Sequence, residues 1–474
     1  MLLFKKINVT TNKYINPRII ALIALMPLTS FSVSTKFINK IESSIPTDFL
    51  KNNNRIATKK DDTLIFEFAG VNNLGYFLRK NLSQLAEHGS NKHINIVAQL
   101  HVLLPGNKKI TKRYYVEKNK LIILNQNDPE TQNMDSGDPK TLISFCKYCV
   151  ENFPAQKYHL ILSNHATGII DIGQARAVNP SQLFTFNPST NMIELNRTLP
   201  FLEFISSPEN QRGICFDDIT GHYLTNEKLD FALKTICNNS IRGKFQSVIF
   251  DACLQQMYEI AILLKPYAKI MMGSQEVILA PGLDYQEVLK PFQNQKIDPL
   301  FFAKHIVASY ENTYKKITND YTFSSIDLDT ISALENNVNT VAAFLIEALK
   351  NKNNSFVRNA IKSSRHKPLC THFDEPSYID LHHFYANMLT NFDRFQFKID
   401  KNDALLKTTL TKLVTALQQG IQIISHVVIA NTVGKNLSLA KGLSIYFPEY
   451  GSKHPSYKYS HAWSLFLDYY LSLK

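Results

Sequence analysis

Apolar and polar positions alternate in blocks from residue 63 onward. Short, nearly continuous apolar runs occur at residues 63–70, 94–104 and 158–163. Between them, apolar residues recur every three or four positions at residues 73–87 and 138–152. The continuous runs are typical of buried strands, and the three-to-four spacing is typical of amphipathic helices. Strands that alternate with helices in this way predict a mostly parallel sheet that is flanked by helices.

A long polar connection at residues 168–208 interrupts the alternation, and connections of this length are usually functional or disordered. A hairpin is predicted over residues 112–124. Further strand-like and helix-like segments occupy residues 213–216, 226–236, 245–250, 254–264 and 269–272. Beyond residue 290 long helical stretches dominate, at residues 299–317, 331–350, 378–389 and 404–430, with β-like pieces at 321–326 and 442–448. The chain is therefore predicted to be an α/β protein with one unit over 63–290. The mainly helical region over 291–474 is either a second domain or a cover on the first.

The N-terminal pattern is different. Basic residues precede an apolar run over residues 19–33, and small residues follow it. This order predicts an export signal over residues 1–34. The run is short for a membrane span, which needs about 20 apolar residues, and an uncleaved anchor is the alternative. Residues 35–62 are polar and predict a linker.

Composition and charge narrow the function classes. The 474 residues are 44% hydrophobic and 19% charged, which is ordinary for a globular chain, with a formal net charge of +12. The basic residues are scattered and form no stripe with aromatic residues, so no nucleic-acid partner is predicted. The Cys146-x-x-Cys149 pair lies in a predicted helix without a second pair, which favours buried cysteines over a metal site. The sequence contains no P-loop, dinucleotide or zinc-protease motif.

Two reactive side chains follow predicted strands. His165 follows the strand at 158–163, and Cys253 follows the strand at 245–250. In a parallel sheet ligands bind beyond the carboxyl ends of the strands, where an imidazole can deprotonate a thiol that attacks a carbonyl. The helix expected from Leu254 would lower the pKa of the thiol, and the N–H groups of Cys253 and of Ala166 or Thr167 would form an oxyanion hole. On position alone, a small buried cysteine and a surface histidine are the commoner interpretation.

Several motifs carry a family resemblance. The segment Phe250–Leu254 reads Phe-Asp-Ala-Cys-Leu, and Leu160–His165 ends in Asn-His. Gly273–Glu276 is followed by Pro281–Tyr285, and Gly442–Pro448 reads Gly-Leu-Ser-Ile-Tyr-Phe-Pro. In this order and spacing they resemble the clostripain-like cysteine peptidases, over roughly residues 63–474. The resemblance implies a caspase-like catalytic domain over 63–290, a dyad of Cys253 and His165, and cleavage after Arg or Lys.

The resemblance also implies a pocket for a basic P1 side chain. It places Asp251, two positions before the nucleophile, in this S1 pocket, where a carboxylate can pair bidentately with a guanidinium. A helix N-cap is the alternative role for Asp251. Glu276 and Asp284 are weaker candidates for the same pocket. The turn after His165 departs from the family pattern, because Ala166 replaces a glycine and its Cβ would crowd a left-handed backbone.

Members of this family are often activated by self-cleavage between the His and the Cys. Three arginines lie in or after the long connection and are candidates, with Arg176 first because its neighbours are small, and then Arg197 and Arg212. Some members depend on calcium. The pair Asp217–Asp218 is too little to assign a metal site, and no cofactor is predicted.

These observations predict a secreted or envelope-directed cysteine endopeptidase. Its partners would be peptide or protein substrates with a basic P1 residue. The chain is expected to be a monomer, intact or nicked into two chains, with no stable membrane insertion once the signal is removed. The alternative is an inactive relative that binds peptides or proteins without cutting them. Retention of Cys253, His165 and Asp251 together favours the enzyme.

Overall fold

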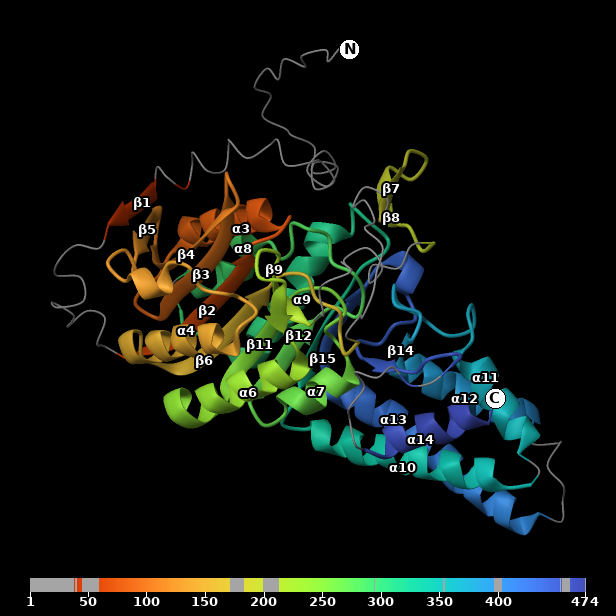
Figure 1. The fold of residues 1–474 in the computed structure, drawn as a ribbon. Helices are drawn as coiled ribbons and strands as arrows, with labels where there is room; N and C mark the ends of the chain where they lie inside the picture. Colours follow the sequence, from red (N-terminus) through yellow and green to blue (C-terminus); the bar gives the residue numbers. More distant parts are fainter. Residues whose placement is uncertain are drawn as a thin grey trace.

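One large sheet organises the chain (Figure 1). The computed structural model describes residues 38, 41–44, 59–170, 183–198, 213–293, 295–352, 354–395, 403–451, 453 and 461–473. Within these residues the sheet has ten strands in the order β1-β5-β4-β3-β2-β6-β11-β12-β13-β15. The strands are β1 (Glu42–Ser44), β2 (Lys60–Gly70), β3 (Ile94–Leu104), β4 (Lys108–Glu117), β5 (Lys120–Ile123), β6 (Ala155–Ser163), β11 (Phe245–Asp251), β12 (Ala268–Gly273), β13 (Thr322–Asp327) and β15 (Val428–Val433).

The centre of the sheet is parallel. Strands β3, β2, β6, β11 and β12 pair in parallel, and β4, β13 and β15 add antiparallel pairs at its two sides. The parallel strands are buried along most of their length, as expected for a sheet covered on both faces. The predicted mostly parallel α/β sheet is confirmed. Strands β13 and β15 come from the region predicted to be mainly helical, so that region also extends the sheet.

Helices cover the sheet on two faces. One group consists of α3 (Gly75–His88), α8 (Tyr285–Leu289) and α9 (Pro299–Tyr314), in which α8 contacts both other helices. The other group consists of α4 (Pro139–Asn152), α6 (Asn226–Ile236) and α7 (Tyr258–Leu264). Helix α4 contains Cys146 and Cys149, both fully buried and unpaired, which confirms the prediction of buried helix cysteines.

The C-terminal helices pack beside the β12–β15 side of the sheet (Figure 1). They are α10 (Ile331–Lys350), α11 (Ser355–Arg365), α12 (Leu381–Phe395), α13 (Ala404–Val427) and α14 (Ala462–Ser472). Trp463 of α14 is completely buried, and its indole Nε1 donates to Tyr446 O at 2.9 Å. This contact joins the last helix to β16 (Ser444–Tyr446), which pairs with β14 (Tyr378–Asp380).

The remaining elements are short. Two hairpin-like pairs are β7 (Phe184–Asn187) with β8 (Met192–Leu195), and β9 (Ile214–Asp217) with β10 (His222–Leu224). Short 3-10 turns span Pro129–Thr131, Lys290–Gln293 and Lys435–Leu437, and a π turn spans Cys237–Ile241. Residues 1–37, which include the predicted export signal, lie outside the described residues. Part of the predicted linker, Glu42–Ser44, forms the edge strand β1.

Several expected boundaries were wrong, including three that lie next to strands or the Cys253 turn. The helix expected from residue 254 begins at Tyr258, the helix expected from 378 is preceded by strand β14, and the helix expected to reach 430 ends at Val427 and continues as β15. Propensity is local, whereas these ends are set by pairing with strands that are distant in sequence.

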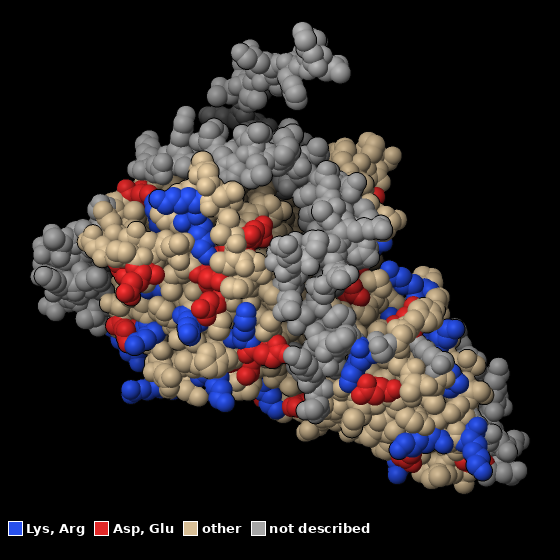
Figure 2. All heavy atoms as spheres, in the orientation of Figure 1, with Lys and Arg blue, Asp and Glu red and all other residues tan. Residues whose placement is uncertain are grey.

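Charge is distributed evenly over the visible surface. Figure 2 shows lysine and arginine interspersed with aspartate and glutamate on one face of the molecule. Among the described residues visible on this face, the charges are mixed and form no basic stripe of the kind that a nucleic-acid groove presents. In the part of the chain that the structure describes, every helix is too short or too polar to cross a bilayer.

Candidate active site

The two predicted catalytic residues follow neighbouring parallel strands. Strands β6 and β11 pair in register, with the Cα of Ser163 opposite that of Asp251. His165 and Cys253 each lie two residues beyond this last pair. The sheet therefore brings both side chains to the same edge, at the carboxyl ends of its central strands, which is where ligands bind in open parallel sheets.

The turns that carry these residues pack closely on each other. Gly168 has a left-handed backbone (φ 68°), and a Cβ at this position would lie 2.8 Å from Leu254 O and 2.7 Å from Met257 Sδ. Leu254, directly after Cys253, is also left-handed (φ 59°) although it is not a glycine. Left-handed non-glycine residues are uncommon and concentrate at functional sites. The left-handed residue of the histidine turn is thus Gly168, not Ala166, so the substitution at Ala166 does not strain the turn.

The His165 ring is oriented by an asparagine. Its Nε2 lies 2.6 Å from Asn73 Oδ1, in the loop after β2. An amide oxygen only accepts hydrogen bonds, so Nε2 carries the proton and the neutral ring presents Nδ1 as its basic nitrogen. The preceding residue is also fixed, because Asn164 donates to Ala69 O and its Oδ1 accepts from Phe216 N.

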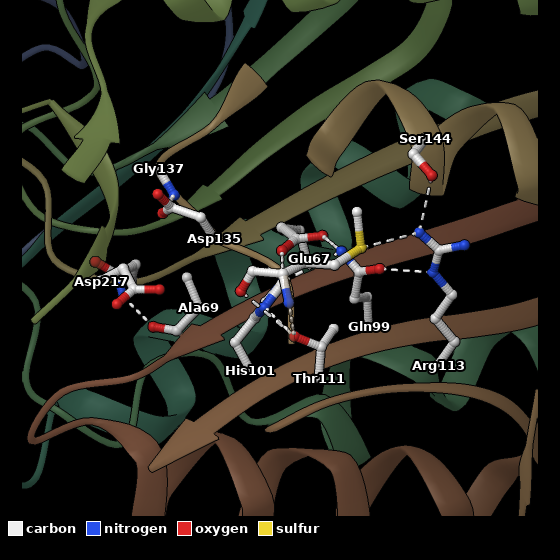
Figure 3. A network of polar contacts seen from close by, with 12 residues as sticks. Glu67, Ala69, Gln99, His101, Thr111, Arg113, Asp135, Gly137, Ser144 and Asp217 are labelled. Atoms are coloured by element: carbon white, nitrogen blue, oxygen red, sulfur yellow. Dashed lines mark hydrogen bonds and ion pairs between the residues drawn. The ribbon is translucent and has the colours of Figure 1, made fainter. Parts of the chain in front are cut away.

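A buried polar network lies in the sheet behind this loop (Figure 3). Glu67 Oε1 pairs with His101 Nε2 at 2.7 Å, and Glu67 Oε2 accepts from Gln99 Nε2 at 3.0 Å. Arg113 donates to Gln99 and to Ser144 at 2.7 and 3.1 Å. Because each buried polar group has a partner, the network rigidifies β2, β3 and β4. We assign it a structural role, since it lies on the strands rather than at their carboxyl ends.

The Cys253 thiol is almost completely buried, with 4% of the residue exposed. Its Sγ accepts a hydrogen bond from Ile278 N at 3.3 Å. Burial raises the pKa of Cys253, the hydrogen bond from Ile278 opposes that rise, and the carboxylates of Asp374, Glu276 and Asp251 add to it. The expected helix N-terminus is wrong at this position, since α7 begins at Tyr258. The dipole of α7 therefore does not act directly on this thiol.

The predicted oxyanion donors lie in two different settings. The backbone of Ala166 forms an isolated antiparallel bridge with Ile214 of β9, and Ala166 is fully buried. Cys253 N lies at the end of β11, in the turn before α7. The oxyanion role of these two N–H groups stays a prediction.

Asp251 lies in a tight polar pocket. Its carboxylate accepts from Tyr285 OH at 2.8 Å, from Leu283 N at 3.0 Å and from Ser163 Oγ at 3.2 Å. Burial raises the pKa of Asp251 to about 6, and the three hydrogen bonds oppose the rise. A Cβ on Gly282 would lie 2.5 Å from both carboxylate oxygens, so this loop closely covers the group. The N-cap alternative for Asp251 is wrong, because Met257 occupies that position of α7.

The two weaker pocket candidates have partners of their own. Glu276 is fully buried and accepts from Arg197 Nη1 at 2.7 Å. Asp284 is the N-cap of α8, accepting from Gln286 N at 3.1 Å, and lines a cavity of about 170 Å³ together with Asn81 and Tyr314. The three carboxylates predicted for the S1 pocket therefore have three different sets of hydrogen-bond partners.

The arginines proposed for self-cleavage are only partly described. Arg176 and Arg212 lie outside the described residues. Arg197 follows β8, and its guanidinium contacts both Glu276 and Asp320. Asp217 accepts from Lys109 Nζ at 2.7 Å. Within the described ranges no group of three or more His, Cys, Asp or Glu residues is arranged to hold a metal ion.

Three functional candidates were missed by the sequence reasoning. Asn73 contacts the imidazole, Ile278 N contacts the thiol, and Asp320 shares Arg197 with Glu276. Asn73 comes just after the strand predicted over residues 63–70, and this position beyond a strand was the available signal. Nothing in the local sequence distinguishes Ile278 or Asp320, because their roles depend on contacts between distant segments.

The family profile of the clostripain peptidases (peptidase C11) matches residues 68–196 and 204–471. The chain belongs to the clostripain family. The predicted family, a family of cysteine peptidases, is thereby confirmed. Clostripain of Hathewaya histolytica is 28% identical over 193 residues, which cover 38% of this chain and 30% of that protein. The chain thus matches about a third of the length of that relative.

Two solved structures share the fold. A secreted C11 cysteine protease from Bacteroides thetaiotaomicron, in complex with an irreversible peptide inhibitor, has a TM-score of 0.53 and 17% identity, covering 86% of this chain and 98% of its own. An inactive zymogen C11 protease from Parabacteroides distasonis has a TM-score of 0.52 and 16% identity, covering 83% and 94%. At these identities the likeness concerns the fold, and it confirms the predicted caspase-like architecture of the clostripain family.

Proposed function

We propose that this protein is an endopeptidase in which Cys253 is the nucleophile and His165 the general base. The observation that carries the proposal is the register of β6 and β11, which places the two residues at matching positions beyond paired strands. The contact between Asn73 and His165 Nε2 supports it, because it leaves Nδ1 as the atom that accepts the thiol proton.

The reaction would proceed by acyl transfer. Nδ1 of His165 takes the Cys253 proton as Sγ attacks the substrate carbonyl carbon, and the carbonyl electrons move to oxygen. N–H groups at Cys253 and Ala166 are our candidates to stabilise that oxyanion. When the C–N bond breaks, the imidazolium protonates the leaving amine. Water then hydrolyses the thioester and regenerates the thiol.

We further propose a preference for Arg, or Lys, at P1 through Asp251. Its position two residues before the nucleophile and its carboxylate support this role. With a pKa of about 6 the carboxyl is ionised at neutral pH. A guanidinium would have to displace one of its present donors, such as Tyr285 OH. Glu276 and Asp284 are less suited to S1, since one already binds Arg197 and the other caps α8.

Self-cleavage between His165 and Cys253 is also proposed, with Arg176 as the first candidate site. Cleavage after Arg197 would require its release from two carboxylates, which ranks this site lower. Arg176→Ala, Arg197→Ala and Arg212→Ala would be purified separately and compared with wild type on a denaturing gel. The site is the one whose loss abolishes the two-fragment pattern, and a pattern that survives all three changes contradicts the proposal.

The decisive experiment compares the full-length chain with Cys253→Ala and His165→Ala. Fluorogenic peptides ending in Arg, Lys, Asp or Leu would be supplied with reductant, with and without calcium. We expect cleavage after Arg and Lys in wild type and a loss of at least about a thousandfold in both variants. Activity that persists in Cys253→Ala would refute the dyad. The two calcium conditions test our proposal that no cofactor is needed.

The burial of Cys253 favours the alternative of a binding protein without peptidase activity. Thiol alkylation separates the two functions, because it would inactivate a peptidase and leave a binding protein able to hold its partner. We also propose export of the chain to the cell envelope or outside the cell. Cell fractionation with N-terminal sequencing tests this, and an uncut chain that stays in the cytoplasm contradicts it.

A further inference from the structure

The guanidinium of Arg197 is bound between two buried carboxylates, one of which belongs to the loop that contacts the Cys253 turn. Arg197 Nη1 lies 2.7 Å from Glu276 Oε2, and Arg197 Nη2 lies 3.2 Å from Asp320 Oδ1. The carboxylate side chains are 0% and 4% exposed, whereas the arginine side chain is 30% exposed. Buried carboxylates are costly without a cation, so this pair requires a positive group in place.

The two carboxylates are held without the help of Arg197. Glu276 Oε1 accepts from Val277 N at 2.9 Å and from Asp374 N at 3.0 Å. Asp320 Oδ1 accepts from Asn436 Nδ2 and Oδ2 from Leu195 N, both at 3.1 Å. The acceptor oxygens are therefore positioned mainly by backbone donors. A site held in this way would accept a guanidinium from another source in the same geometry.

A cavity opens beside this pair. It has a volume of about 540 Å³, and its lining includes Arg197, Asp320, Lys367 and His372. His372 is 94% buried, and neither ring nitrogen has a hydrogen-bond partner among the described residues. Burial, with help from nearby cations, lowers the pKa of His372 to about 3, so the neutral ring offers one donor and one acceptor. Unused polar atoms of this kind suit the peptide groups of a ligand.

The pair and the Asp251 pocket are connected through the loop that contacts the thiol. A single loop runs from Glu276, past Ile278, whose N–H contacts Cys253 Sγ, to Leu283, whose N–H contacts Asp251. The start of this loop is also joined to the nucleophile turn, because Leu254 N donates to Glu276 O at 3.3 Å. A peptide lying along the loop with one basic side chain at Asp251 would direct a neighbouring side chain toward Glu276.

We propose that Glu276 and Asp320 form a second subsite for a basic side chain of the peptide substrate, a subsite that Arg197 fills in the intact chain. This inference rests on the proposed peptidase function. It makes the preferred substrates peptides with two basic residues, one at the cleaved bond and one nearby. Lys367 lines the same cavity, and its positive charge repels other cations there. A guanidinium that pairs with both carboxylates would offset this repulsion better than a cation that lies farther from them.

The test replaces the internal guanidinium. Arg197→Met keeps an unbranched apolar side chain and removes the positive charge that pairs with the two carboxylates. Arg242→Met, at an exposed turn, is the matched control. Peptides would carry Arg at P1 and either Arg or its neutral isostere citrulline at each of P4 to P2 and P1′ to P2′. In Arg197→Met we expect Arg at one position to raise kcat/KM roughly tenfold over citrulline, mainly through KM.

The second variant, Arg197→Met with Asp320→Asn, should lose this gain and still cleave the peptide that has a single arginine. Equal rates for Arg and citrulline at every position in Arg197→Met would overturn the second subsite and leave the peptidase proposal intact. Failure of both wild type and Arg242→Met to cleave any peptide would refute the peptidase instead. Calorimetric titration of N-acetylarginine amide then still tests the subsite: loss of binding on adding Asp320→Asn supports it, and no effect of Asp320→Asn overturns it.

Discussion

Ser163 and Asp251 are paired at the ends of the two central parallel strands, and Ser163 Oγ donates to the Asp251 carboxylate at 3.2 Å. This contact joins the strand that precedes His165 to the strand that precedes Cys253. It also connects the proposed S1 carboxylate to the strand of the proposed base. The proposed recognition of the substrate and the proposed activation of the thiol would therefore be coupled through one strand pair, and perturbing either strand end should affect both.

Asn73 should act by positioning the imidazole. Asn73→Ala removes the acceptor for His165 Nε2, and we expect kcat/KM to fall about 3- to 10-fold, the worth of one solvent-exposed hydrogen bond. Asn73→Asp keeps an acceptor and adds a negative charge that favours the protonated imidazole. The imidazole pKa seen in the pH profile of kcat/KM should therefore shift to a higher pH. An unchanged rate and pH profile in Asn73→Ala would remove Asn73 from the mechanism.

Gly168 should be required for the close packing of the turn after His165 against the turn after Cys253. Gly168→Ala places a Cβ against Leu254 O and Met257 Sδ in a left-handed backbone, and we expect a loss of about 2–4 kcal/mol in the free energy of unfolding. Gly106→Ala is the matched control, because its backbone is also left-handed (φ 78°) and its Cβ would meet nothing within 4 Å. Urea unfolding measures both, and equal losses would show that packing is unimportant.

Asp251 should make stability depend on pH. Burial raises the pKa of Asp251 to about 6, so the folded state binds this proton more tightly than the unfolded state. The stabilising contribution is fully present below the ordinary pKa of 3.8 and is lost as pH rises through 6. We expect Asp251→Asn to gain about 3 kcal/mol relative to wild type between pH 3 and pH 7.5. Urea unfolding at several pH values checks this, and a constant difference would contradict the raised pKa.

Glu67 should contribute to stability through its buried partners. Glu67→Ala leaves His101 and Gln99 without their carboxylate acceptor inside the sheet (Figure 3), and we expect a loss of about 3–5 kcal/mol. Glu151→Ala is the control, because its partner Lys147 and its own side chain are exposed, and it should change stability by about 0.5 kcal/mol or less. Similar effects of the two changes in urea unfolding would show that the network contributes little.

Much of the framework was predictable from local pattern. The strand at 94–104 and the helix at 331–350 were predicted with the bounds that the structure has, because the strand is a nearly continuous apolar run and the helix is a long segment. The positions of His165 and Cys253 at strand ends also followed from the alternation of strands and helices. Motif order was enough to identify the family, which the profile match confirms.

Tertiary structure decided how these pieces meet. Only strand order makes β6 and β11 neighbours, and only their register places His165 and Cys253 at matching positions. The start of α7 at Tyr258, the contact between Asn73 and His165, and the place of Arg197 between two carboxylates join segments far apart in the chain. Periodicity reports which face of a segment is buried, and it carries no information about which distant segment covers that face. The sequence by itself therefore determined the elements and the reactive residues, whereas long-range packing decided their partners, their protonation and the shape of the site.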